Sequence, residues 1–187
     1  MRTTIKRTPS VKATSSYTTG RRRRTTFRRR KRVRLRYVHH NALHAAIEIL
    51  LIDDNAGDVR LTTEALRESG VRAHLSVARN GGEALAFLQR QGGFAAAARP
   101  DLILLDLNLP GKDGQTILAE IKGSPDLKTI PVIVLTTSTD ARDVLGSYQL
   151  HANAYVVKSV DYDQFVQAMR SIDSFWLNHV TLPGTAS

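Results

Sequence analysis

The chain has 187 residues but no cysteine, and it has no apolar run long enough to cross a bilayer. Without cysteine, disulfides, thiolate metal sites and thiol catalysis are excluded. The lack of cysteine also fits a reducing compartment, so we expect a cytoplasmic protein. A membrane-spanning helix needs about 20 consecutive apolar residues, and no segment approaches that length. No continuous apolar stretch follows the basic N-terminus, which disfavours a secretory signal peptide.

Acidic residues are absent from the first 40 positions. Residues 1–40 hold 15 of the 27 Lys and Arg residues and none of the 17 Asp and Glu residues. The remaining residues therefore carry a net charge of −5, although the whole chain carries +10. We divide the chain into a disordered basic extension (1–44), one globular domain (45–180) and a short tail (181–187).

The basic extension has too few apolar residues to offset the entropy lost on ordering. One hypothesis is an arm that binds nucleic acid or an anionic membrane, with Phe27 and Tyr37 available to stack on bases. Alternatives are an organelle transit peptide and a start site assigned too far upstream. A metal site at His39, His40 and His44 is a weaker hypothesis, because these residues lie at the end of the disordered segment.

From residue 47 onward, apolar strand-like runs alternate with helix-like segments. Strands are predicted at residues 47–52, 74–78, 102–105, 132–135 and 154–157, and a helix follows each of them. The last helix is predicted over residues 161–177, with Asp161 at its N-terminus. Alternating strands and helices predict a parallel sheet covered on both faces. Since no Gly-x-Gly-x-x-Gly or P-loop motif is present, we expect an α/β flavodoxin-like doubly wound sheet with strand order 2-1-3-4-5.

Polar residues follow four of the five predicted strands at the point where each ends. They are Asp53 and Asp54, then Asp106, then Thr136 and Thr137, and finally Lys158. In an open parallel sheet, ligands bind beyond the carboxyl ends of the strands. Taken singly, such residues are most often caps, turn residues or solvated charges. Together, at successive strand ends, they predict one site.

The residue types in this predicted site suit phosphoryl transfer. Clustered carboxylates repel one another and favour a hard divalent cation such as Mg²⁺, which neutralises charge on a transferring phosphoryl group. An ammonium group supplies a point charge for a phosphoryl oxygen, and a hydroxyl donates a hydrogen bond to another. Asp106 directly follows four apolar residues, and burying a carboxylate without a partner is costly.

At this point the sequence resembles a known family over about 130 residues. It is similar to response-regulator receiver domains of the chemotaxis-regulator type, and more narrowly to single-domain regulators partnered with bacterial phytochrome-type histidine kinases. The segments that carry the resemblance are 54–61 (DNAGDVRL), 106–114 (DLNLPGKDG), 135–138 (LTTS) and 171–177 (SIDSFWL).

The resemblance implies that Asp106 accepts a phosphoryl group from a phosphohistidine of the kinase. It also implies that Asp54 and Asp106 ligate Mg²⁺ through carboxylates and Asn108 through its backbone carbonyl. Asp53 would support the metal through water. The domain would catalyse its own phosphorylation and slow dephosphorylation, but it would act on no separate substrate and is not expected to be an enzyme.

The resemblance assigns the response to three further residues. Lys158 would pair with the phosphoryl oxygens, Thr136 would move to bond the new phosphate, and Tyr155 would follow into the vacated space. Output would then run through protein contacts, onward phosphotransfer or dimerisation. Trp176, near the end of the last helix, is equally consistent with the core and with a homodimer interface.

One residue departs from the family pattern. Receivers usually carry proline after the conserved lysine, with a cis peptide bond between them, whereas this chain has Ser159. A cis bond before a residue other than proline costs about 3–4 kcal/mol. This departure raises the hypothesis of a degenerate receiver that takes no phosphate. A second alternative is a nucleic-acid-binding protein that acts through residues 1–40, with the receiver as a regulatory platform.

Overall fold

The computed structural model describes residues 46–70, 72–177, 179–180 and 182–183. The predicted basic extension, its three histidines and its nucleic-acid hypothesis lie outside the described residues, as does most of the predicted tail. Within the described segments, no helix combines the length and the apolar character needed to cross a membrane.

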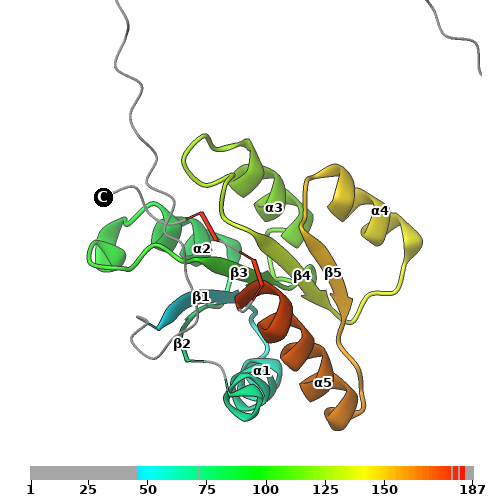
Figure 1. Ribbon diagram of the computed structural model, residues 1–187. Coiled ribbons are helices and arrows are strands. Elements are labelled where there is room, and N and C mark those ends of the chain that lie inside the picture. Colours follow the sequence, from blue (N-terminus) through cyan, green and yellow to red (C-terminus); the bar gives the residue numbers. More distant parts are fainter. Residues whose placement is uncertain (1–45, 71, 178, 181, 184–187) are drawn as a thin grey trace, which may run out of the picture. The chain divides into compact units, whose positions relative to one another are not determined.

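Five parallel strands form one sheet in the order β2-β1-β3-β4-β5 (Figure 1), which confirms the expected flavodoxin-like topology. The strands are β1 (Ile47–Ile52), β2 (Ala73–Ala78), β3 (Leu102–Leu105), β4 (Val132–Thr136) and β5 (Ala154–Val157). All four residues of the central β3 are buried. A continuous apolar run is what a parallel strand covered on both faces requires.

Helices cover both faces of the sheet. They are α1 (Ala56–Ser69), α2 (Gly81–Leu88), α3 (Gly114–Gly123), α4 (Ala141–Gln149) and α5 (Tyr162–Ile172), with a short 3-10 turn η1 (Gly92–Phe94) after α2. Figure 1 shows α1 and α5 on one face and α2, α3 and α4 on the other. Each strand is thus connected to the next by a helix, as the alternating sequence predicts.

The core has two layers, one on each side of the sheet. Along β1, Ile49 and Leu51 face the α1 and α5 layer, whereas Leu50 and Ile52 face the layer under α2 and α3. This alternation follows from the two-residue period of a strand. Phe165 of α5 is 1% exposed and packs in the first layer. The strand ends are therefore held by packing from both sides.

The last helix differs in part from the prediction of one long helix over residues 161–177. The α-helix ends at Ile172 and continues as the π-helical turn η2 (Asp173–Leu177). A π turn spans one more residue than an α turn, so it changes which side chains face the core. Trp176 packs against the α1 and α5 layer, whereas Phe175 is left exposed. The expected cap is confirmed, because the Gln164 N–H donates to the Asp161 carboxylate at 3.0 Å.

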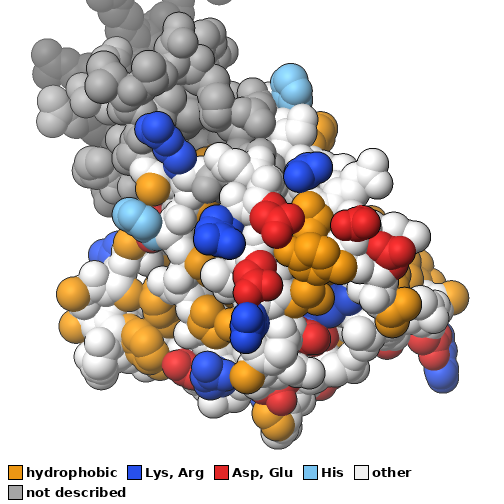
Figure 2. All heavy atoms as spheres, turned by 90° about the horizontal axis from the view of Figure 1, so that it is seen from below, with side chains coloured by type: hydrophobic (Ala, Val, Ile, Leu, Met, Phe, Trp, Pro, Cys, Tyr) orange, Lys and Arg blue, Asp and Glu red, His pale blue; other side chains and the backbone are white. Residues whose placement is uncertain are grey.

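Acidic and basic side chains are interspersed on the face of the molecule shown in Figure 2, with small hydrophobic patches between them. This mixture agrees with the modest negative charge of the sequence after residue 40. The strong positive charge of the whole chain is thus a property of its first 40 residues and not of this face of the domain.

Candidate functional site

Asp53 and Asp106 lie side by side because the strands that carry them are paired in register. Ile52 of β1 is the partner of Leu105 of β3, and each aspartate directly follows one of these residues. The Asp106 N–H donates to the Ile52 carbonyl at 2.9 Å, which extends the strand pairing by one residue. Both side chains are buried, so two carboxylates lie next to each other, away from solvent, at the ends of adjacent strands.

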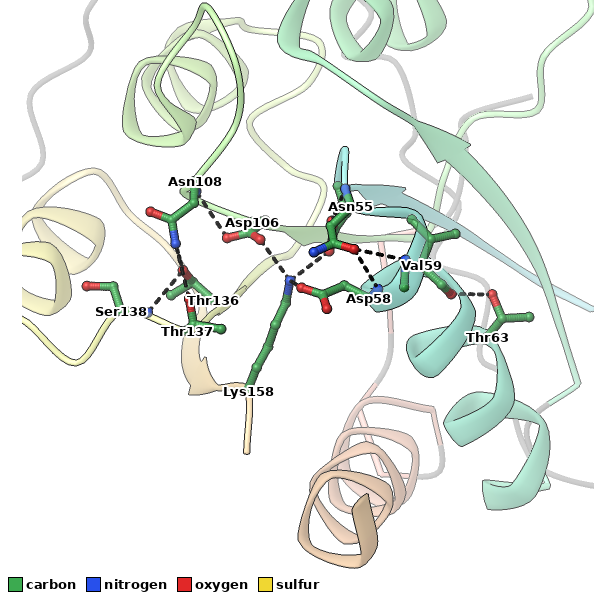
Figure 3. A network of polar contacts seen from close by, with 12 residues as sticks. Asn55, Asp58, Val59, Thr63, Asp106, Asn108, Thr136, Thr137, Ser138 and Lys158 are labelled. Atoms are coloured by element: carbon green, nitrogen blue, oxygen red, sulfur yellow. Dashed lines mark hydrogen bonds and ion pairs between the residues drawn. The ribbon is translucent and has the colours of Figure 1, made fainter. Parts of the chain in front are cut away.

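Lys158, directly after β5, offsets part of the negative charge of this pair. Its Nζ lies 2.7 Å from a carboxylate oxygen of Asp53, of Asp106 and of Asp58. Figure 3 shows its side chain extending from the end of β5 toward Asp106 and Asp58. An ammonium has three N–H donors, so these three bonds use all of them.

The environment favours a charged Lys158. Burial alone lowers the pKa of Lys158, but the hydrogen bonds to Asp106, Asp53 and Asp58 outweigh burial and raise that pKa above its usual value. Burial raises the pKa of Asp53, and the bond to Lys158 opposes this rise. Lys158 is therefore a fixed positive charge at neutral pH, placed between carboxylates.

Backbone groups hold the second oxygen of each buried carboxylate. Asp53 Oδ1 accepts the Asn55 N–H at 3.0 Å, and Asp106 Oδ1 accepts the Asn108 N–H at 3.1 Å. Each carboxylate is thus bonded to Lys158 through one oxygen and to the chain two residues later through the other. This double attachment fixes the orientation of both aspartates before any ligand arrives.

Asp58 is a site residue that the sequence reasoning missed. It lies in the first turn of α1, three residues after the N-cap Asn55, whose side chain accepts the N–H groups of Gly57 and Asp58. An acid at this position is ordinarily explained by the positive end of the helix. The signal that could have found Asp58 is its place: the first turn of α1 begins where β1 ends, beside the predicted site.

Asp54 lies differently from its predicted partners. Its side chain is exposed, and it is not among the three carboxylates that approach one another at Lys158. The structure brings together Asp53, Asp106 and Lys158, as predicted, and adds Asp58. The direct metal ligation expected of Asp54 and of the Asn108 carbonyl stays a prediction.

A chain of hydrogen bonds connects the site with the segment before α4. The Asn108 side chain donates to the hydroxyls of Thr136 and Thr137 at 3.2 and 3.3 Å, as Figure 3 shows. Thr136 is fully buried, and its hydroxyl also accepts the Ser138 N–H at 3.3 Å. The Tyr155 hydroxyl donates to the Ser138 carbonyl at 3.0 Å. Thr136 and Tyr155, the two predicted switch residues, therefore contact the same loop.

Ser159 follows Lys158 through a trans peptide bond. Its hydroxyl accepts the Asp161 N–H at 3.1 Å and donates to the Gln164 side chain at 3.2 Å. The serine thus joins the loop after β5 to the first turn of α5. The Lys158 side chain reaches both buried aspartates with a trans bond at this position.

The donor set suits a hard divalent cation. One carboxylate oxygen from each of Asp53, Asp58 and Asp106 lies within 4.8 Å of the others. All three donors are oxygens, the ligand type that Mg²⁺ and Mn²⁺ prefer when bound through carboxylates. Four of the six buried polar or charged residues in the described chain belong to this site, namely Asp53, Asp106, Thr136 and Lys158. Burial of so much charge is costly and marks a functional site.

Comparison with known proteins agrees with this geometry. Residues 49–170 match the family model of the response regulator receiver domain. The chain therefore belongs to the response regulator receiver family, whose members are signalling proteins of two-component systems.

Its relatives include regulators of phytochrome signalling. The chain is 52% identical to response regulator Rcp1 of Synechocystis sp. over 135 residues, which cover 72% of this chain and 92% of Rcp1. The phosphorylated cyanobacterial phytochrome response regulator RcpA superposes with a TM-score of 0.71 at 50% identity, covering 75% of this chain and all of RcpA. The Mn²⁺-bound form of Rcp1 gives a TM-score of 0.70 at 51% identity, covering 74% of this chain and 99% of the Rcp1 chain. The protein is thus a response regulator whose receiver domain is similar to Rcp1 and RcpA.

Proposed function

We propose that Asp106 accepts a phosphoryl group from a phosphohistidine of a sensor histidine kinase, and that the protein signals through contacts that change on phosphorylation. The observation that carries this proposal is the placement of Lys158 Nζ 2.7 Å from both Asp53 and Asp106 at the strand ends. A fixed ammonium beside an oriented carboxylate is the arrangement that phosphoryl transfer needs.

In the transfer step, an oxygen of Asp106 attacks the phosphorus atom. The bond between phosphorus and the histidine nitrogen breaks, its electron pair stays on the imidazole, and a new P–O bond creates an acyl phosphate. Lys158 pairs with oxygens of the transferring phosphoryl group. The Thr136 hydroxyl turns away from the Asn108 side chain and donates a hydrogen bond to a further phosphoryl oxygen. The same residues support self-phosphorylation from small phosphodonors and slow self-dephosphorylation by water.

Mg²⁺ is the cation that we propose for this site. When bound, it neutralises charge on the phosphoryl group. Asp106 and Asp54 would hold it through carboxylates and Asn108 through its carbonyl, with Asp53 acting through water. The cluster of carboxylate oxygens from Asp53, Asp58 and Asp106 supports a divalent cation at this site, as does the Mn²⁺-bound form of the relative Rcp1. Asp54 lies outside that cluster, so its role as a ligand rests on the family resemblance alone.

The kinase partner that we propose is of the phytochrome type. Support comes from the similarity to RcpA, a phytochrome response regulator, and to the bacteriophytochrome response regulator AtBRR, which is 40% identical at a TM-score of 0.60. Since such a kinase obtains its phosphoryl group from ATP, we place the protein in the cytoplasm.

Movement of Thr136 and Tyr155 would alter the loop before α4, where the Tyr155 hydroxyl donates to the Ser138 carbonyl. The homodimer hypothesis at Trp176 stays a prediction.

The proposal is tested by incubating the full chain with acetyl phosphate and Mg²⁺ and measuring the intact mass. The wild type should gain the mass of one phosphoryl group, and Asp106→Asn should gain none. Asp101→Asn is a matched control, because Asp101 precedes the same strand and its carboxylate accepts the Glu48 N–H at the other end of the sheet. Equal labelling of the wild type and Asp106→Asn would contradict the proposal.

A further inference from the structure

Asp58 differs from the other two carboxylates around Lys158 in its position and in its attachment. It belongs to helix α1, whereas Asp53 and Asp106 follow strands. Its side chain is 29% exposed, compared with 0% for Asp53 and 7% for Asp106. Asp58 therefore occupies the solvent side of the Lys158 ammonium, which is the side from which a phosphodonor arrives.

The attachment of Asp58 is also the weakest of the three. Asp53 and Asp106 each bind a backbone N–H through their second oxygen. Within the described part of the chain, Lys158 is the only hydrogen-bond partner of the Asp58 carboxylate. Because water can solvate a partly exposed carboxylate, releasing Asp58 from Lys158 costs less than releasing either buried aspartate.

The donors of Lys158 are saturated, and this creates a conflict when phosphate arrives. Its three N–H groups already bond three carboxylates at 2.7 Å. A new bond from Nζ to a phosphoryl oxygen must replace one of them. In addition, the negative charge of Asp58 repels an incoming phosphoryl group that carries negative charge itself.

We propose that Asp58 is a positioning residue that occupies one N–H of Lys158 in the resting protein and yields its place on Nζ to a phosphoryl oxygen. Asp58 thereby restrains phosphorylation, because its carboxylate competes with the phosphoryl group for the same ammonium. Phosphorylation then releases the first turn of α1 from Lys158. This inference rests on the proposed function of Asp106 and deepens it.

The test compares the binding of beryllofluoride, a phosphoryl mimic, to the full-length wild type, Asp58→Asn and Glu64→Gln. The bound species is counted by ¹⁹F NMR at a Mg²⁺ concentration shown by titration to saturate each variant. Asp58→Asn removes the competing charge at nearly constant shape, so beryllofluoride affinity should rise about three- to tenfold, and acetyl phosphate should label Asp106 faster. Glu64→Gln removes an acid of the same helix that pairs with Arg60 instead, so it should match the wild type.

The direction of the change separates positioning from a merely structural role. Damage to the fold or loss of a metal ligand would leave the affinity of Asp58→Asn at or below that of the wild type, and either result overturns the inference. Asp58→Ala gives an independent check, since it must also bind beryllofluoride more tightly than the wild type. If the wild type itself binds no beryllofluoride, the proposed function of Asp106 fails. If the wild type binds and both Asp58 variants match it, only the role of Asp58 fails.

Discussion

Lys158 is buried with a full positive charge, and three carboxylate acceptors make this burial tolerable. The same contacts relieve the repulsion between Asp53 and Asp106, which face one another at adjacent strand ends. This ammonium offsets part of the negative charge of the three carboxylates. A bound cation and Lys158 therefore act on the same carboxylates. Loss of Lys158 should make the stability of the domain depend more strongly on the cation.

The variant Lys158→Met should be destabilised by about 3 kcal/mol in the presence of a chelator, because it leaves two buried carboxylates without their cation. Added Mg²⁺ should restore more stability to this variant than to the wild type. Urea unfolding with and without Mg²⁺ measures both effects. The control Lys112→Met removes a partly exposed ion pair with Glu120 and should cost less than about 1 kcal/mol. An equal loss in both variants would show that Lys158 does not balance the buried charge.

Gly114, at the start of α3, allows the helix to approach the backbone that carries Asp106. A Cβ atom there would lie 2.5 Å from the Asp106 carbonyl oxygen and 2.5 Å from the Leu107 Cα. Gly114→Ala should therefore lower the free energy of unfolding by about 1–3 kcal/mol and slow labelling by acetyl phosphate. At Gly123 in the same helix, a Cβ would meet nothing within 4 Å, so Gly123→Ala should cost nothing. Similar thermal unfolding of the two variants would refute the close-approach argument.

At the scale of elements, the strands and helices are placed by signals that are local in the sequence. All five strands were predicted, three of them with the observed bounds, because apolar runs between polar segments mark buried strands. The cap Asp161 was also predicted, and its carboxylate accepts a backbone N–H group as expected. The π-helical turn after Ile172 was missed, since its hydrophobic pattern also fits a continuing α-helix.

The start of α1 couples an ordinary helix cap to the site. The Asn55 side chain accepts the N–H groups of Gly57 and Asp58 at 2.8 and 3.3 Å. Asn55→Ala should cost about 1 kcal/mol through loss of the cap, whereas Asn55→Ser should retain most of the stability. Thermal unfolding of both variants measures the difference. If alanine and serine prove equally stable, the cap contributes nothing to the start of this helix.

At the scale of the whole molecule, the sequence predicted which strand ends meet but not how each side chain points. The convergence of Asp53, Asp106 and Lys158 follows from the strand order, because the carboxyl ends of parallel strands share one edge. The exposed position of Asp54 and the contact of Asp58 with Lys158 depend on how α1 begins, which residue types alone do not specify. Positive charge is concentrated in the first 40 residues, whereas the phosphate chemistry is assigned to the domain that follows.

The central claim is that one carboxylate, Asp106, carries the phosphoryl group. The most direct measurement is to treat the full chain with acetyl phosphate and Mg²⁺, reduce the acyl phosphate with sodium borohydride, and map the peptides by mass spectrometry. Borohydride converts a phosphorylated aspartate into homoserine and leaves free aspartates unchanged. The account predicts homoserine at position 106, with Asp53, Asp54 and Asp58 intact. Homoserine at any of those three positions, with Asp106 unmodified, would contradict it.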